Sequence, residues 1–270
     1  MNKFIKGLVW VAGLFTLAML MFIVIFIFYK GIPNMNWGMF NWKYTTSNVS
    51  MMPAIISTLV IVAIALLIAV PFGVFTSFYL VEYADPNNKF LKVIRLATDT
   101  LAAVPSIVYG LFGMLFFVIN LGMGYSHWAG ILTITIMILP IIISSTEEAL
   151  RSVNNELRMG SLALGAGKLR TIFTVVLPVA MPGILSGIIL AVGRIVGESA
   201  ALIYTLGSST SMLRGLGDSG RTLAVHMYML SQEGFHVSEA YSTAAILVLM
   251  VLIINSISTW LSNKLASGGK

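Results

Sequence analysis

The sequence has no cysteine, which excludes disulfide frameworks, thiolate metal sites and cysteine nucleophiles. Charge is also scarce: Asp, Glu, Lys and Arg make up 10% of the 270 residues, whereas soluble domains usually carry about 25%. So few charges cannot cover a surface in water, which makes a soluble enzyme, a disordered chain and a nucleic-acid-binding protein poor interpretations. With 58% hydrophobic residues and a mean hydropathy of +0.94, the chain is predicted to cross a membrane several times.

Long charge-free runs set the number of crossings, because a bilayer core of about 30 Å needs roughly 20 apolar residues in a helix. Six helices are predicted. They lie between residues 6 and 30, from about 52 to 81, on either side of a turn at 120–128 between residues 99 and 147, from about 178 to 205, and between 239 and 264. The first is expected to be a retained helix, because its apolar run is too long for a signal peptide.

The positive charges are unevenly distributed between the two sides that this topology defines. With the N-terminus inside, eleven Lys and Arg residues fall in inside segments and four in outside segments, leaving Arg194 within a helix. Cytoplasmic loops carry an excess of Lys and Arg, so both termini are predicted to be cytoplasmic. We expect a multi-pass protein of the cell membrane, in contact with lipid.

The longest inside segment, at 146–177, is too short for a nucleotide-binding domain. Its glycine-rich stretch at 165–168 lacks the first glycine of a phosphate-binding loop and the Ser or Thr that should follow the lysine. No nucleophile, cofactor or zinc signature is visible, and His127, His226 and His236 have no metal-ligand spacing. We predict no enzyme activity and no cofactor, so ATP-driven transport would need another chain to hydrolyse ATP.

A small amphipathic helix is predicted within this segment. Ser152 or Asn154 can cap it near Asn155, and Gly165 can end it in the left-handed conformation. The helix either rests on the membrane surface or binds a cytoplasmic partner. The residues that would carry such a contact are Glu156, Leu157, Arg158, Ser161, Leu162, Leu164 and Gly165.

The residues after this helix follow a recognisable pattern. Gly165 is followed ten residues later by Val175 and then by Leu177-Pro178. This spacing resembles the conserved loop of ABC importer permeases, in which a Glu-Ala-Ala triplet precedes the glycine. Here the triplet positions hold Met159-Gly160-Ser161. The resemblance implies that the helix binds a groove on a cytoplasmic ATP-binding subunit.

Two further stretches, at 102–113 and 193–205, are similar to the PstA family of phosphate importer permeases. That family typically has Thr at position 199 and Pro at position 201, where this chain has Ser199 and Ala201. The resemblance runs from about residue 50 to the C-terminus. It implies an all-α, polytopic membrane bundle built on the MetI-like core of type I ABC importer permeases.

The resemblance also divides the chain and implies its partners. Residues 1–50 would hold an added N-terminal transmembrane helix and an outer loop, and residues 51–270 the permease domain with its coupling loop at 146–177. The partners would be phosphate, a second homologous permease, cytoplasmic ATP-binding subunits and an extracytoplasmic phosphate-binding protein.

Two charged residues stand inside the predicted fifth helix. Arg194 and Glu198 are four residues apart, so they share one helical face and can pair. Burying an arginine at a helix centre costs roughly 3 kcal/mol, which the surrounding aliphatic residues offset. Either the pair holds the bundle together, or Arg194 lines the route and binds an oxyanion while Glu198 moderates the attraction. Ser199 and the serines at 208–211 could add weaker donors.

Glycines on the same helix predict close helix packing, at the spacings Gly183 to Gly187 and Gly193 to Gly197. Taken together, these features predict the permease subunit of an ATP-driven phosphate importer. Another oxyanion such as sulfate or molybdate is the alternative substrate. The alternative classes are a stand-alone channel or secondary transporter and a membrane-embedded enzyme.

Overall fold

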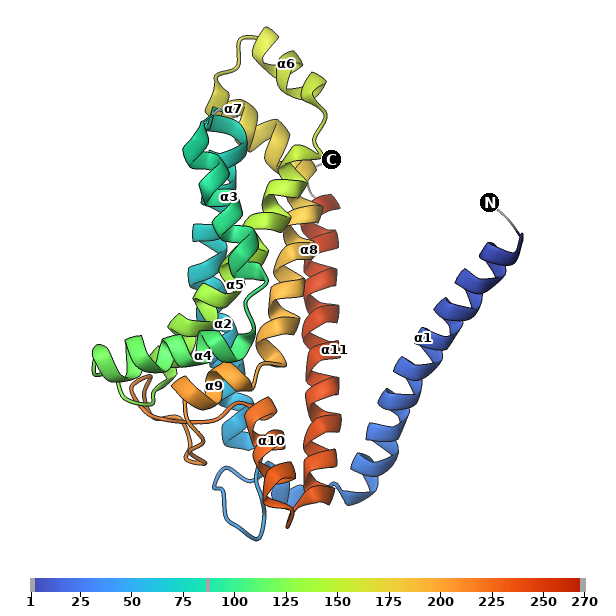
Figure 1. Ribbon diagram of the computed structural model, residues 1–270, viewed down its shortest axis with the longest axis vertical. Helices are drawn as coiled ribbons and strands as arrows, with labels where there is room; N and C mark the ends of the chain where they lie inside the picture. Colours follow the sequence, from blue (N-terminus) through green and yellow to red (C-terminus); the bar gives the residue numbers. More distant parts are fainter. Residues whose placement is uncertain (1–2, 86–87, 268–270) are drawn as a thin grey trace.

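The computed structural model describes residues 3–85 and 88–267, and over these residues the regular structure is entirely helical (Figure 1). Short 3₁₀ turns at Ile32–Asn34 and Trp37–Phe40 follow the first helix, and π-helical turns at Tyr79–Tyr83, Met114–Asn120 and Ile172–Val176 adjoin longer ones. The α-helices are α1 (Lys3–Gly31), α2 (Met52–Phe78), α3 (Lys89–Ala102), α4 (Ser106–Gly113), α5 (His127–Arg151), α6 (Asn155–Ala163), α7 (Lys168–Thr171), α8 (Leu177–Val196), α9 (Ala200–Thr205), α10 (Leu223–Glu233) and α11 (Val237–Ser267).

Within the described residues, five helical segments are long and apolar enough to cross a membrane, and the predicted six are reached when one bent pair is counted as a span. The bent pair overlaps the predicted third helix, which was expected to begin after residue 99, but it starts earlier, in α3, and breaks by 101° between Ala102 and Ser106. Pro105 lies in this break, and a proline disfavours helical backbone in the residue before it. As a result α4 lies across the bundle, whereas α3 runs along it (Figure 1).

Helices α2, α5 and α8 form the centre of the bundle through close backbone contacts. A Cβ added at Gly73 of α2 would lie 2.6 Å from Cγ2 of Ile142 in α5. On the other side of α5, a Cβ at Gly183 would lie 2.6 Å from Cβ of Ala149, and one at Gly187 would overlap Ser145. The predicted close packing is therefore confirmed for the first glycine spacing.

The second glycine spacing does not make such a contact. A Cβ added at Gly193 would meet nothing within 4 Å, and Gly197 lies beyond the last residue of α8. Close packing at these two positions was therefore a wrong prediction, because Gly193 faces open space and Gly197 lies beyond the end of the helix.

Helix α1 stands apart from the bundle over most of its length (Figure 1). It meets α11 near its C-terminal end, where the Ser242 hydroxyl donates to the carbonyl oxygen of Gly31 at 2.8 Å and the rings of Phe26 and Tyr241 lie 5.9 Å apart. The start of α1 and the end of α11 lie toward the end of the molecule that carries α6, and α10 lies at the opposite end (Figure 1).

Candidate translocation pocket and docking helix

A pocket of about 630 Å³ opens where α5, α8 and α11 meet. Arg194, in the last turn of α8, lines it together with Asn255 of α11. Nε of Arg194 and Oδ1 of Asn255 are both buried without a hydrogen-bond partner. A guanidinium and an amide that share a pocket and are incompletely paired can together bind an anion or ordered water. The remaining lining residues are Ile141, Ser186, Ile189, Leu190 and Gly193.

The predicted pairing of Arg194 with Glu198 is not what the structure shows. Helix α8 ends at Val196, and Glu198 accepts a hydrogen bond from the backbone N–H of Ala201 at 3.1 Å, at the start of α9. Glu198 is 8% exposed, and the described residues include no ion pair between it and Arg194. The fifth helix was expected to continue to about residue 205. The helix ends before Glu198, so the two residues do not share a helical face, and Ser199 lies just before α9.

The predicted helix at 155–165 is confirmed in position and in its ends. The side chain of Asn154 accepts from the backbone N–H of Glu156 at 3.0 Å, and Gly165 has a left-handed φ of +82°. Helix α6 projects from one end of the molecule (Figure 1) and has no buried residue. The apolar side chains that it exposes are Leu157, Met159 and Leu162, with Leu164 just after its end.

Arg158 differs from its neighbours on α6 because it faces the rest of the chain. Its Nε donates to Oε1 of Glu82 at 3.0 Å, and its side chain is 15% exposed. Its other two nitrogens donate to the backbone carbonyl oxygens of Val153 and Leu150. Ser161 also faces inward, since its hydroxyl lies 2.9 Å from that of Thr171. Of the predicted docking residues, the leucines and Glu156 are exposed, whereas Arg158 and Ser161 make contacts within the chain.

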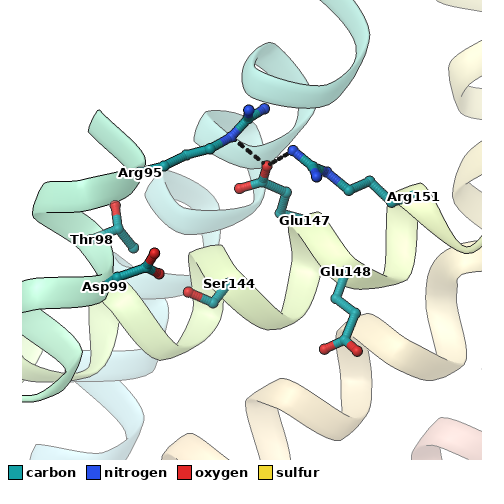
Figure 2. A pocket seen from close by; sticks show the side chains of 7 residues that line it. All are labelled: Arg95, Thr98, Asp99, Ser144, Glu147, Glu148 and Arg151. Atoms are coloured by element: carbon teal, nitrogen blue, oxygen red, sulfur yellow. Dashed lines mark hydrogen bonds and ion pairs between the residues drawn. The ribbon is translucent and has the colours of Figure 1, made fainter. Parts of the chain in front are cut away.

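A second pocket, of about 340 Å³, lies between α3 and α5 (Figure 2). Its centre is Glu147, whose Oε1 accepts from Arg95 at 2.8 Å and also from Arg151. Figure 2 shows Glu148 leaving α5 on the opposite side from Glu147. Two arginines face three carboxylates in this lining, a net charge of −1, so this pocket lacks the excess positive charge of the Arg194 pocket.

The opposite end of the bundle is held by a buried histidine. The two ring nitrogens of His127 lie 2.7 Å from the carbonyl oxygen of Asp218 and 3.0 Å from the hydroxyl of Ser57. A Cβ added at Gly220 would lie 2.6 Å from Cε1 of the same ring. His127 therefore ties α5 to α2 and to the loop after α9, a structural role that the spacing of the histidines did not reveal.

Two residues of these sites were not singled out from the sequence. Asn255 is a lone amide in the apolar run of α11, and Glu82 ends the charge-free run of the second helix. A polar residue within a predicted membrane span is the signal that could have drawn attention to Asn255. Nothing in the sequence indicates the partner of Glu82, because Arg158 lies 76 positions away.

Comparison with known sequences accounts for this arrangement. The family described as "binding-protein-dependent transport system inner membrane component" matches residues 69–268. The chain belongs to this family. This match and the relatives named PstA, at 31–36% identity, together confirm the predicted class, a multi-pass ABC importer permease of the PstA type.

Individual relatives cover most of the chain. The probable ABC transporter permease protein YqgI of Bacillus subtilis is 39% identical over 218 residues, which are 74% of this chain and 74% of that protein. The phosphate transport system permease protein PstA of Haemophilus influenzae is 31% identical over 258 residues, 94% of this chain and 91% of that protein.

Solved structures agree on the fold. The bacterial ABC transporter that imports alginate has a chain that matches with a TM-score of 0.64 at 14% identity, over 97% of this chain and 99% of that one. A chain of the inward-facing MetNI methionine transporter matches with a TM-score of 0.61 at 19% identity, over 80% and 94%. The predicted MetI-like bundle is thereby confirmed, while identities this low say nothing about substrate.

Proposed function

We propose that this chain is the transmembrane permease subunit of an ATP-driven phosphate importer and forms half of its translocation pathway. Phosphate as the substrate is supported by the PstA relatives, among them the Haemophilus influenzae protein at 31% identity. The other half would come from a second permease of similar fold, and phosphate would be delivered by an extracytoplasmic binding protein. Residues 1–50 would form the added helix and outer loop, and residues 51–270 the permease domain.

The observation that carries the proposal is the half-buried, incompletely paired guanidinium of Arg194. A charge in an apolar bundle is tolerated where it faces protein partners or a water-filled cavity, and here it faces a pocket of about 630 Å³. Phosphate offers several anionic oxygens to which a guanidinium can donate two parallel hydrogen bonds. In this proposal Arg194 attracts the anion and the amide of Asn255 orients it.

Glu198 and Ser199 take a more local part in the proposed pathway. The Glu198 carboxylate fixes the start of α9 and keeps a negative charge within the loop that follows Arg194. That charge would limit how tightly an anion is held, and a conducting site must release what it binds. Ser199 would offer a neutral hydroxyl at the same break.

The proposed energy source is a separate ATP-binding subunit that binds α6 and the adjoining loop. The exposed side chains of Leu157, Leu162 and Leu164 would enter an apolar groove of that subunit, with Glu156 at its rim and Gly165 setting the turn. Since α6 would then be cytoplasmic, both termini would be cytoplasmic as well. The exposed apolar length of α1 would contact lipid.

The experiment that tests this function is phosphate uptake by the complete transporter in proteoliposomes. We expect Arg194→Gln to lower uptake about a hundredfold or more, because a buried anion would lose its charged donor. Arg194→Lys should retain part of the activity, since it keeps the charge without the planar pair of donors. Lys30→Gln removes one positive charge at the end of α1 and is the matched control.

Three outcomes would contradict the proposal. Unchanged uptake in Arg194→Gln would remove Arg194 from the pathway. Stronger competition by sulfate or molybdate than by unlabelled phosphate would assign another oxyanion. Accumulation by the chain alone, driven by an ion gradient, would exclude the dependence on an ATP-binding subunit. The amount of each copurified subunit controls for assembly.

A further inference from the structure

The side chain of Arg158 joins the docking helix to two other helices. Nε lies 3.0 Å from Oε1 of Glu82, Nη1 lies 2.6 Å from the carbonyl oxygen of Val153, and Nη2 lies 2.7 Å from that of Leu150. The side chains of Arg158 and Glu82 are only 15% and 9% exposed. Arg158 is thus occupied within the chain, although it lies on a helix whose leucines are exposed.

Two adjacent residues at the inner end of α2 contact α6 and α7, the short helix that follows it. Glu82 and Tyr83 end the π-helical turn that continues α2. Glu82 receives Arg158 of α6, and the ring of Tyr83 lies under the ammonium group of Lys168 in α7, 4.6 Å from Nζ to the ring centroid. The segment between Arg158 and Lys168 is therefore fixed to α2 at each of its ends.

The chemistry of this contact depends on the guanidinium. The carbonyl oxygens of Leu150 and Val153 lie at the C-terminal end of α5, where carbonyls without the regular intrahelical partner and the helix dipole favour a positive charge. One planar group reaches these two oxygens and the Glu82 carboxylate together, which a single ammonium group cannot do with the same geometry. Removing either charge would leave its partner poorly solvated and without a counter-charge.

From α2, close contacts continue to the helix that carries Arg194. The Ser77 hydroxyl donates to the carbonyl oxygen of Ile143 at 2.9 Å, one turn of helix beyond the Gly73 contact with α5. Helix α5 in turn packs against α8 at Gly187, where the Ser145 side chain of α5 lies directly against the glycine backbone. Tightly packed elements like these move together rather than deform.

We propose that Glu82 and Arg158 are positioning residues that make α6 and the inner end of α2 move as one body during transport. A displacement of α6 then reaches α2 directly, and α5 and α8 through it. The inference rests on the proposed docking of an ATP-binding subunit on α6. It also assigns Arg158 an internal role in place of a contact with that subunit.

The first test measures coupling in the complete transporter. Glu82→Gln removes the charge at nearly constant shape, and Arg158→Lys keeps the charge but loses the planar geometry. We expect either variant to raise the number of ATP molecules hydrolysed per phosphate transported by about fivefold or more, the lower limit of typical coupling between sites. The amount of copurified ATP-binding subunit should not change. Glu148→Gln, an exposed carboxylate on α5, is the matched control.

The second test needs no substrate and uses the absence of native cysteine. Spin labels are attached at Asn155→Cys on α6 and Tyr79→Cys at the end of α2, both exposed positions, and their separation is measured with and without ATP. The separation should stay constant in the otherwise unaltered transporter. With Glu82→Gln the distribution of separations should become broader, and its mean should change when ATP binds.

Each outcome of these two tests decides for or against the inference. An ATP-to-phosphate ratio equal to that of Glu148→Gln, or a label separation that is as constant in Glu82→Gln as in the unaltered chain, would overturn the inference. Loss of the ATP-binding subunit in proportion to lost uptake would overturn it as well, because the ion pair would then only maintain docking. Absent phosphate uptake in the unaltered transporter would contradict the proposed substrate alone, and the label separations would still decide the inference.

Discussion

Two arginines in the interior of this chain have different surroundings, and this difference separates a structural charge from a candidate binding group. Arg221 is 5% exposed and lies over the ring of Tyr44, with 4.9 Å from Cζ to the ring centroid. A cation over the face of an aromatic ring is stabilised in that position. Each guanidinium has one buried nitrogen without a hydrogen-bond partner, Nη2 in Arg221 and Nε in Arg194, but of the two only Arg194 lines an open pocket. Of the two, it is Arg194 that has room for a ligand.

His226 lies beside Arg221 and makes the folded chain sensitive to acid. It is fully buried with neither ring nitrogen hydrogen-bonded, and burial together with the Arg221 charge lowers the pKa of His226 from 6.5 to about 3. Between these values the unfolded chain binds a proton that the folded chain does not, so this contribution to stability falls as the pH falls. The loss is about 1.4 kcal/mol per pH unit below 6.5.

The prediction is a thermal unfolding temperature that declines below pH 6.5 and declines less steeply in His226→Phe. Phenylalanine keeps a ring against Tyr44, whose ring centroid lies 6.2 Å from that of His226, and it cannot be protonated. Intrinsic fluorescence of the chain in lipid nanodiscs at several pH values measures this. His236→Phe, at a histidine that is not fully buried, is the control. Parallel declines for the unaltered chain and His226→Phe would refute this role.

The sequence correctly placed Arg194 within a helix but did not predict that this helix ends two residues later, at Val196. The expected pairing with Glu198 assumed a helix that continues through both residues, and Gly197 ends that helix between them. Residues four apart meet only on an unbroken helix. The ends of α6, by contrast, depend on Asn154 and Gly165 alone, and such local signals were sufficient to predict them.

At the scale of helices, the contact between α5 and α8 depends on Gly187. A Cβ at this position would overlap the side chain of Ser145, so Gly187→Ala is expected to destabilise the chain by roughly 1–3 kcal/mol through overpacking. Chemical denaturation in detergent micelles measures the loss. Ser145→Gly should restore stability in the double variant, because it removes the atoms that overlap.

Gly193→Ala is the matched control for this contact, since the added methyl group would meet nothing within 4 Å. We expect its stability to stay within about 0.5 kcal/mol of the unaltered chain. Equal destabilisation by both substitutions would show that loss of glycine itself, and not the contact with α5, is responsible.

The end of α6 gives a prediction of its own. Gly165, just after α6, has a φ of +82°. At this φ, any residue other than glycine is strained by about 1–2 kcal/mol, and a branched side chain by more. Gly165→Val should therefore displace Leu164 from the docking surface and weaken copurification of the ATP-binding subunit, while Gly165→Asn, which tolerates this conformation, should weaken it less. Gly160→Ala is the control, because that glycine has ordinary helical backbone and open surroundings. Equal copurification in all three variants would refute this role for the turn.

The direction of a helix is harder to predict than its length. The charge-free run after residue 99 correctly indicated two helical segments, α4 with its π-helical continuation and α5, but α4 meets the preceding α3 at 101° and lies across the bundle. An apolar run shows that a segment avoids water and not how it is oriented. The ion pair of Glu82 with Arg158 was hidden for a related reason, since its partners meet only once α2, α5 and α6 are assembled.

At the scale of the whole molecule, the two proposed sites lie in different regions joined by one packed unit. Helix α6 projects at one end, and the end of α8 that carries Arg194 lies beside the middle of α11 (Figure 1). Helices α2 and α5 connect them through the contacts at Gly73 and Gly187. Such an arrangement suits a protein whose driving force is applied at a distance from the anion that it moves.

The orientation of this unit in the membrane follows from its charges and can be measured directly. Eleven Lys and Arg residues in the segments predicted to be inside, which include α6, against four in the outside segments predict that α6 is cytoplasmic. Because the chain has no cysteine, a single cysteine reports the side on which it lies. A membrane-impermeant maleimide should label Ser209→Cys in intact cells and Asn155→Cys only after permeabilisation. Both positions are exposed or half-exposed, so burial alone would not prevent labelling. Labelling of Asn155→Cys from outside would show that the topology is the opposite of the predicted one. It would also exclude the proposed docking of an ATP-binding subunit on α6.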